Sequence, residues 1–409
     1  MDREWREAID LRSSLLSIGI VVAVAALLRG WNLGRGGLAP VESDIVGAVV
    51  QLLHTGAYQP ASLVRPTLPV YLQAAVAIVH FLGGAVTGAW QSIDAYGADE
   101  MIGWGRGCSA LLGTAVVFVV YQIGMRWGAR HALLAAGLMA VTPMHVGASR
   151  EIGDGAPLAF FAALALLFSL TACERVTRRA FAAAGAASGL AAACHYAGAM
   201  TIVMPLVAAW MTRSDESSRV WRASFALAAA LAAFMVATPL SVRDVPAFLD
   251  GFAATAAPPA GVAGVANVDL LGQLLAALQW PGVILAFAGL CLAVVRAVTG
   301  PGHTRWTLLA SFPLVYFTLV AWHGATSETV VLPMVPAVTL LAAIAVISGV
   351  SQLRRFDIPR AARTALIAAL TVTALLPPAV FSIELVRQQS REPDAAVPKA
   401  IGRATSTNR

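Results

Sequence analysis

Long apolar runs alternate with short charged stretches along the whole chain. Runs of about 20 residues, long enough to cross a bilayer, begin near Ser13, Gly103, His131, Gly155, Ala223, Leu270, Trp306, Val330 and Thr364. The run from Ala180 to Thr212 is too long for one crossing, and the break at His195 to Gly198 predicts two short helices that go out and return. The pattern therefore predicts an all-α polytopic membrane protein with about 11 transmembrane helices.

The basic residues predict how these helices are oriented. They form short clusters between the apolar runs, and such clusters favour the cytoplasmic side. Counting the apolar segment Pro66 to Val86 as a crossing would put the next five clusters outside, so we interpret it as lying on or dipping into the outer face. The clusters are Arg126/Arg130, Arg175/Arg178/Arg179, Arg213/Arg219/Arg222, Arg296/Arg305 and Arg354/Arg355/Arg360/Arg363.

This topology divides the chain into a transmembrane domain and a tail. The transmembrane domain covers residues 1–385, and its first external loop, from about 34 to 102, carries membrane-surface helices. An odd number of crossings leaves residues 386–409 as a short extracytoplasmic tail and the N-terminus in the cytoplasm. Connectors seldom reach the length of the first loop without a function.

Composition agrees with a membrane protein and excludes several classes. Hydrophobic residues make up 58% of the chain and charged residues 12%, a balance outside the range of soluble domains. The four cysteines show no CxxC spacing, so neither a disulfide framework nor a zinc site is indicated. The formal charge of +6 is dispersed among the clusters and does not indicate a nucleic-acid partner.

Two short acidic segments are the candidates for chemistry. Glu42 and Asp44 follow the first span, and Asp154 lies four residues after Arg150 in the second external loop. A carboxylate near a low-dielectric region is costly, so acids there more often serve a substrate, metal or proton than packing. Structural roles stay open: the three acids could cap helices, and Arg106 could pair with Asp99 or Glu100.

Several motifs, in this order, resemble the polytopic glycosyltransferases of the GT-C fold. The closest likeness is to the protein-mannosyltransferase and aminoarabinose-transferase branch, which takes sugars from dolichyl- or undecaprenyl-phosphate. The motifs are Leu28-Arg29, Glu42, Gly56-Ala57-Tyr58, Arg65-Pro66-Thr67-Leu68, Gly105-Arg106, Arg150 with Asp154, Gly189-Leu190 to His195-Tyr196, and Leu332-Pro333-Met334-Val335-Pro336.

The resemblance implies roles for these residues. Asp44, Glu42 and Asp154 are the expected catalytic carboxylates, and Asp154 and Glu42 are possible ligands of a divalent metal, Mg²⁺ or Mn²⁺. Arg106, Arg150, Arg65 and His195 are expected to bind the phosphate of the donor, because arginine keeps its charge and binds phosphate oxygens in pairs. For His195, a packing role is an open alternative.

One departure from the family changes the picture. Spacing back from Gly56 puts Val41 where the family has its catalytic Asp, while a helix would place Asp44 on roughly the same face as Val41. Thr329-Val330 likewise stands where many members have Arg-Tyr. A catalytically degenerate GT-C-like scaffold, or a subunit of a membrane complex, is therefore the alternative to an enzyme.

The leading interpretation is a glycosyltransferase of the bacterial cytoplasmic (inner) membrane. It would move a hexosyl or pentosyl group from a polyprenyl-phosphate carrier to an acceptor on the extracytoplasmic side. Membrane lipid is the second expected partner, and protein, lipid A and a cell-wall glycan all fit as the acceptor. A secondary transporter is disfavoured, because no inverted repeat is apparent and the spans carry almost no ionisable residues.

Overall fold

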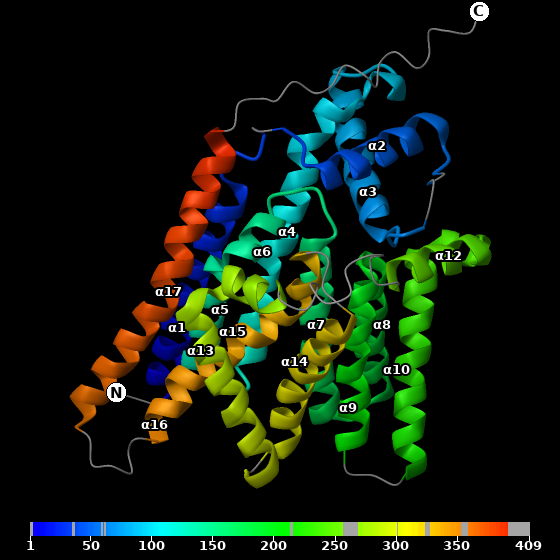
Figure 1. Ribbon diagram of the computed structural model, residues 1–409. Helices are drawn as coiled ribbons and strands as arrows, with labels where there is room; N and C mark the ends of the chain where they lie inside the picture. Colours follow the sequence, from blue (N-terminus) through cyan, green and yellow to red (C-terminus); the bar gives the residue numbers. More distant parts are fainter. Residues whose placement is uncertain are drawn as a thin grey trace, which may run out of the picture.

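The computed structural model describes residues 3–34, 37–58, 60, 63–212, 216–256, 269–300, 302–323, 328–352 and 359–391. All regular elements in these ranges are helices, most of them gathered in one bundle (Figure 1). Helices α2 and α3 lie together at one end of that bundle. The predicted class, an all-α polytopic protein, is confirmed.

Each predicted apolar run contains a helix, although α1 begins ten residues before Ser13 and α5, at 13 residues, is shorter than the predicted crossing. They are α1 (Arg3–Gly30), α2 (Pro40–Thr55), α3 (Leu68–Thr87), α4 (Ala98–Gly124), α5 (Ala129–Val141), α7 (Gly155–Arg175), α8 (Arg178–Cys194), α9 (Val203–Met211), α10 (Glu216–Ala237), α13 (Asp269–Thr299), α14 (His303–His323), α15 (Val335–Ile344) and α17 (Arg360–Arg391). Short elements connect them: η1 (Ile93–Ala95), α6 (Pro143–Ala148), η2 (Tyr196–Ile202), α11 (Pro239–Arg243), α12 (Val245–Ala256), η3 (Glu328–Met334), η4 (Ala345–Gly349) and α16 (Val350–Gln352).

Seven helical segments in the described ranges are long and apolar enough to cross a membrane. Shorter apolar helices accompany them at Leu15–Gly30, Ala129–Val141 and Tyr196–Met211. The predicted count of about 11 crossings stays a prediction. The seven segments are Leu68–Thr87, Ala98–Gly124, Gly155–Arg175, Glu216–Ala237, Leu271–Thr299, Thr329–Gly349 and Arg360–Ser390.

The predicted break at His195 is confirmed. His195 has an extended backbone (φ −153°, ψ 136°) between α8 and η2, and its ring Nδ1 accepts a hydrogen bond from the backbone N–H of Ala197 at 3.2 Å. The chain then continues through η2 into α9, back toward the end of the bundle where α8 begins (Figure 1).

Glycines on α8 bring it unusually close to α10. A Cβ atom at Gly185 would lie 2.0 Å from the carbonyl oxygen of Ala226, and one at Gly189 would lie 2.1 Å from that of Ala230. Such short approaches need a residue without a side chain. The Gly/Ala-rich sequence of α8 therefore lets α8 and α10 pack closely together.

The first loop folds into a cap around its own small core. Tyr96 is fully buried in it, together with residues of α2 and α3 such as Val49 and Ala77. The Tyr96 hydroxyl pairs with His80 Nδ1 at 3.1 Å, and its carbonyl oxygen pairs with His54 Nε2 at 3.0 Å. These contacts fix α2 and α3 relative to the loop that joins them to α4.

Two predicted boundaries lie at this end of the bundle. α3 is long and apolar enough to cross, yet it packs beside α2 against α4 at the capped end (Figure 1). The interpretation that Pro66 to Val86 does not cross is supported by that position and stays a prediction.

α17 continues to Arg391, so the predicted division at 385/386 falls inside a helix. Residues 392–409 of the predicted tail lie outside the described ranges.

Candidate functional site

A pocket of about 490 Å³ opens beneath the first loop. Its walls come from α2, from the connection between α2 and α3, from the start of α3 and from two residues of the bundle. The lining residues are Val41, Asp44, Ile45, Ala48, Gln51, Tyr58, Pro60, Val64, Arg65, Pro66, Pro69, Val70, Asp154 and Cys194. Segments far apart in sequence therefore meet at one cavity.

Three of the predicted site residues line this pocket: Asp44, Asp154 and Arg65. Asp154 occupies the N-cap position of α7, but its side chain makes no capping hydrogen bond. None of the three charged groups makes an ion pair or a side-chain hydrogen bond with another residue in the described ranges. Charged groups without internal partners in a cavity are free to bind a ligand.

The N-terminal turn of α2 decides which of its residues face the pocket. The helix begins at Pro40, so Val41, Asp44, Ala48 and Gln51 all lie within it and follow one another at helical spacing. The prediction that Val41 and Asp44 share a face is confirmed. Gln51 and Tyr58 also line the pocket, although the sequence assigned neither a role in the site. The available signal for Gln51 was its position seven residues after Asp44, two helical turns along the same face.

Glu42 lies on a different side of α2 and is buried in an ion pair with Arg106. Arg106 Nε donates to Glu42 Oε1 at 2.9 Å, and Nη2 donates to Oε2 at 2.8 Å. The backbone N–H groups of Ala39 and Ile152 also donate to this carboxylate, at 3.0 and 2.8 Å. The alternative that Arg106 pairs with Asp99 or Glu100 is wrong.

Arg106 extends the same network to the preceding loop. Its Nη1 donates to the carbonyl oxygen of Leu33 at 3.1 Å, and its Nη2 donates to that of Gly37 at 2.9 Å. The pair therefore joins the end of the first span, α2, α4 and the loop before α7. Neither Glu42 nor Arg106 lines the pocket. Their contacts hold together α2 and the loop before α7, the two segments that carry Asp44 and Asp154, and their predicted catalytic and phosphate-binding roles stay predictions.

Arg150 likewise holds the framework together. Its Nη1 donates to the carbonyl oxygens of Leu28 and Trp31, at 3.1 and 2.9 Å, where the last carbonyls of α1 need partners. Its Nε donates to Gln389 Oε1 in α17 at 2.7 Å. Arg150 is buried and does not line the pocket.

A further arginine, Arg29, is fully buried beside this framework. Its guanidinium donates to the carbonyl oxygens of Ala140 (2.9 Å) and Met139 (3.1 Å) and to His145 Nδ1 (2.9 Å). Because arginine only donates, His145 must accept at Nδ1 and carry its proton at Nε2. The sequence motif Leu28-Arg29 marks this residue, but spacing alone does not reveal its partners.

His195 lies next to the pocket without lining it. Burial lowers the pKa of its imidazole, while the charge of Asp154 raises that pKa and the charge of Arg65 lowers it. The two charged groups of the pocket thus act on the pKa of His195 in opposite directions. Its predicted role in donor binding stays a prediction.

The acidic side chains of the pocket determine whether the predicted metal fits there. Within the described ranges, no group of three or more His, Cys, Asp and Glu side chains is placed to hold a metal ion. Asp44 and Asp154 share the pocket and supply the oxygen ligands that Mg²⁺ and Mn²⁺ prefer. Glu42 does not fit that role, because four N–H groups already occupy its carboxylate.

Comparison with known proteins shows which families and folds this chain is similar to. Residues 102–242 match the dolichyl-phosphate-mannose-protein mannosyltransferase family. A search of curated proteins found no match. Similar solved structures come from membrane glycosyltransferases at low sequence identity.

The oligosaccharyltransferase of Archaeoglobus fulgidus in its apo form matches with a TM-score of 0.66 and 14% identity, over 94% of this chain and 57% of that one. ArnT from Cupriavidus metallidurans bound to undecaprenyl phosphate matches with a TM-score of 0.60 and 17% identity, over 92% of this chain and 75% of that one. The chain thus spans little more than half the length of the archaeal enzyme. These matches confirm the predicted fold class, and residues 102–242 carry the family resemblance.

Proposed function

We propose that this GT-C chain, which is related to the protein mannosyltransferases and ArnT, moves a sugar from a polyprenyl-phosphate carrier to an acceptor on the extracytoplasmic side of the membrane. The observation that carries the proposal is the convergence on one pocket of Asp44, Asp154 and Arg65, none of which makes an ion pair or side-chain hydrogen bond within the part of the chain that the structure describes. Solved structures with this fold contain such carriers: ArnT with undecaprenyl phosphate, and the archaeal enzyme AglB with an inhibitory peptide and a dolichol-phosphate.

The pocket contains the groups that the reaction needs. In the transfer, the acceptor oxygen bonds to the anomeric carbon of the sugar while the bond from that carbon to the carrier phosphate breaks. Asp44 or Asp154 takes the proton of the acceptor as general base. The phosphate leaves with the carrier and gains negative charge, which the Arg65 guanidinium stabilises through paired hydrogen bonds.

The size and lining of the pocket suit a sugar phosphate at the end of an apolar chain. Its volume of about 490 Å³ lies in the range of small-ligand sites. Ile45, Val64 and Val70 give the walls an apolar part beside the three charged groups. The proposed donor sugar is a hexose or a pentose.

A divalent metal fits the same pair of carboxylates. Mg²⁺ typically binds through one or two carboxylates plus water and substrate phosphate oxygens, and Asp44 and Asp154 are the two carboxylates in the pocket. Such an ion would add positive charge next to the leaving phosphate. The archaeal oligosaccharyltransferase has been solved with Zn and sulfate.

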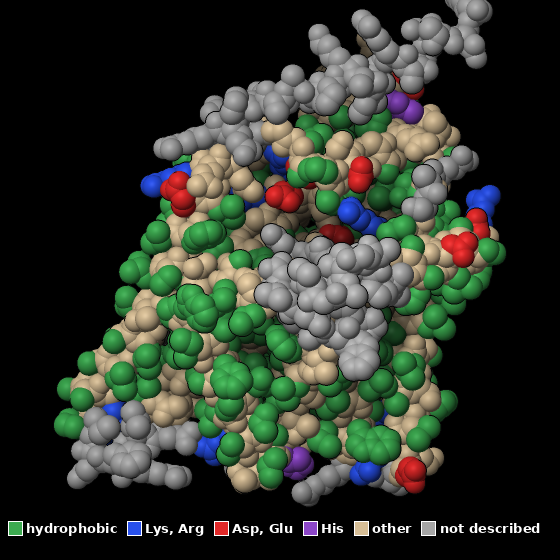
Figure 2. All heavy atoms as spheres, viewed as in Figure 1, with side chains coloured by type: hydrophobic (Ala, Val, Ile, Leu, Met, Phe, Trp, Pro, Cys, Tyr) green, Lys and Arg blue, Asp and Glu red, His purple; other side chains and the backbone are tan. Residues whose placement is uncertain are grey.

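The distribution of charge supports the proposed orientation in a bacterial inner membrane, with the N-terminus in the cytoplasm. Figure 2 shows a broad apolar surface between two charged ends: Lys and Arg side chains appear at both ends, whereas most of the visible Asp and Glu side chains lie at the capped end, so the end opposite the cap is the more basic one. Basic residues gather on the cytoplasmic side of inner-membrane proteins. The pocket at the capped end would then open toward the outside, where acceptors are found.

The test is sugar transfer by the purified full-length protein with a panel of undecaprenyl-phosphate-linked hexoses and pentoses. We expect Asp154→Asn and Asp44→Asn to lower the rate by about a hundredfold or more where the carboxylate acts as the base. Asp94→Asn is the matched control, because Asp94 is exposed in the same loop but does not line the pocket. Full activity in both pocket variants would overturn the proposed roles.

The alternative is a scaffold or subunit of a membrane complex that has lost catalysis. Its supporting observation is Val41, which lines the pocket where the resembling family has its catalytic Asp. A scaffold co-purifies with partners in fixed ratio, retains no polyprenyl phosphate and transfers no sugar. An enzyme retains that lipid, and Asp44, one turn along α2, serves in place of the missing Asp.

A further inference from the structure

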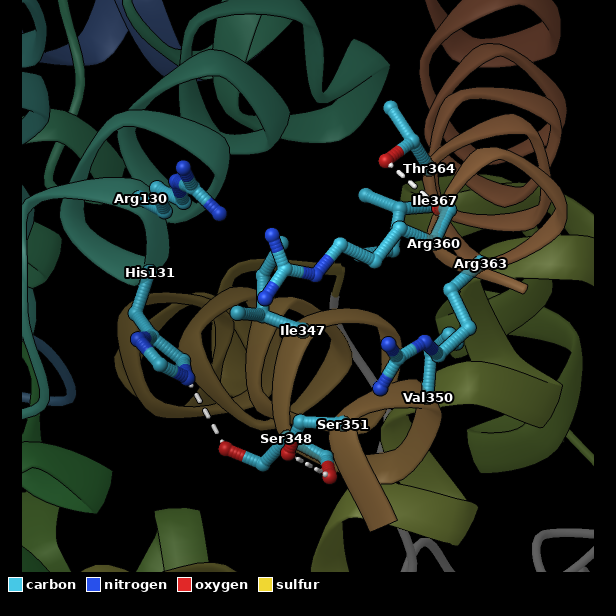
Figure 3. A pocket seen from close by; sticks show the side chains of 10 residues that line it. All are labelled: Arg130, His131, Ile347, Ser348, Val350, Ser351, Arg360, Arg363, Thr364 and Ile367. Carbon is cyan, nitrogen blue, oxygen red and sulfur yellow. Dashed lines mark hydrogen bonds between the residues drawn. The ribbon is translucent and has the colours of Figure 1, made fainter. Parts of the chain in front are cut away.

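A second pocket, of about 620 Å³, lies at the end of the bundle opposite the cap. It is formed where the start of α5 and the start of α17 meet η4 and α16 (Figure 3). Three arginines, Arg130, Arg360 and Arg363, project into it from two helices. Nothing in the proposed transfer reaction uses this pocket.

Among the described residues, no acidic side chain pairs with the three guanidinium groups. Arg130 from α5 and Arg360 from α17 reach toward each other across the pocket, and Arg363 extends along its side (Figure 3). None of the three makes an ion pair or a side-chain hydrogen bond with another residue that the structure describes. Like charges brought together without a counter-charge repel one another, so an anion between them would be bound favourably.

The backbone adds to the positive potential. Arg130 is the second residue of α5, and Arg360 is the first residue of α17. Helix N-termini carry a partial positive charge and unpaired N–H groups, which favour anions. The arginine cluster and the two helix ends therefore act in the same direction.

The remaining wall is an unusual stretch of helix. η4 has π-helical hydrogen bonding over Ala345–Gly349, a form that is rare and often found at functional sites. It carries Ile347 and Ser348 into the wall of the pocket, and Ser348 Oγ is held by His131 Nε2 at 2.8 Å. This bond ties the π-helical turn to the start of α5.

From this arrangement we propose that the pocket binds a phosphate group, which Arg130, Arg360 and Arg363 hold together. An anionic lipid headgroup is the source that the surroundings favour. Ile347, Val350 and Ile367 give the pocket an apolar side, and α17 continues from it with exposed apolar residues such as Leu366 and Val372. A headgroup in the pocket would thus leave its acyl chains along an apolar helix face.

The experiment measures binding to the full-length protein in detergent. Native mass spectrometry would count bound phosphatidylglycerol against phosphatidylcholine, and calorimetry with inorganic phosphate would test the free ion. The test variant is Arg360→Gln with Arg363→Gln. The matched control, Arg175→Gln with Arg179→Gln, removes the same charge from exposed positions outside the pocket.

We expect the wild type to prefer phosphatidylglycerol, and the test variant to bind it about tenfold or more weakly while the control is unchanged. Arg363→Lys should retain part of the affinity, because it keeps the charge but loses the paired donors. Binding of inorganic phosphate without a lipid preference, lost in the same variant, would support the phosphate site with a soluble source. No phosphate binding in either arm, or equal losses in test and control, would overturn the proposal.

Discussion

Two Arg–Glu pairs have nearly equal closest distances, but one is buried with two hydrogen bonds and the other is partly exposed with one, so together they test what the buried pair contributes to this fold. Arg106 and Glu42 approach to 2.8 Å with side chains 7% and 1% exposed, whereas Arg126 and Glu174 approach to 2.9 Å with side chains 16% and 55% exposed. The perturbation is Arg106→Ala, compared with Arg126→Ala. If the first pair holds the cap to the bundle, Arg106→Ala must lower the stability of the fold much more than Arg126→Ala does.

The magnitude follows from the partners that Arg106→Ala strands. The substitution leaves the Glu42 carboxylate buried with only the Ala39 and Ile152 N–H donors, and it leaves the Leu33 and Gly37 carbonyl oxygens without this partner. Breaking a buried pair costs about 3–5 kcal/mol, whereas a pair with an exposed partner contributes about 0–1 kcal/mol. At about 2 °C per kcal/mol for a long chain, we expect Tm to fall by about 6–10 °C against about 2 °C or less.

The assay is thermal unfolding of the purified proteins in one detergent, followed by intrinsic fluorescence. Limited proteolysis of residues 34–102 accompanies it, because a loosened cap should be cut faster in Arg106→Ala only. Glu42→Gln keeps the shape of the side chain but places an NH2 group against N–H donors and leaves the Arg106 charge unpaired, so it should also lower Tm strongly. Equal shifts in Tm for Arg106→Ala and Arg126→Ala, with unchanged proteolysis, would refute the positioning role of the buried pair.

Three further outcomes are expected. Gly185→Ala and Gly189→Ala should each push α8 away from α10 and lower Tm, at a cost of about 1–3 kcal/mol. Gly19→Ala is the control and should leave Tm unchanged, because a Cβ there meets nothing within 4 Å. Equal effects on Tm would contradict the close packing. Burial lowers the pKa of His195 below its usual 6.5, so below pH 6.5 the unfolded chain binds more protons than the folded one. Tm should therefore fall more below pH 6.5 in the wild type than in His195→Gln. Parallel curves of Tm against pH for the two proteins would exclude this. Arg150→Ala should free the end of α1 from α17 and raise amide hydrogen exchange at Leu28 to Trp31. Unchanged exchange there would show that Arg150 does not hold the two helices together.

The helices and the face of α2 could be predicted from the sequence because both depend on local periodicity. The break at His195 and the shared face of Val41 and Asp44 follow from residue spacing within one segment, and the structure confirms both. The start of α2 at Pro40 does not follow from spacing, since proline fits the first turn of a helix as well as a loop.

The pairings between distant segments could not be predicted in this way. Arg106 binds Glu42 across 64 residues, and Arg150 binds Gln389 across 239 residues. Every arginine near the outer end has the same local signal, so spacing does not distinguish Arg65, which lines the pocket, from Arg106 and Arg150, which hold the framework. Three-dimensional packing alone makes that distinction.

The account stands on the claim that the pocket beneath the cap holds the lipid-linked donor. The most direct measurement is photo-crosslinking of a diazirine-bearing polyprenyl phosphate to the full-length protein, with the modified peptides mapped by mass spectrometry. The account predicts crosslinks in the segments that line the pocket, around Ala48 to Gln51 and Val64 to Val70, and their loss in Arg65→Gln. Crosslinks confined to other surfaces, such as the groove of Leu27, Trp31 and Ile383 between α1 and α17, would contradict it.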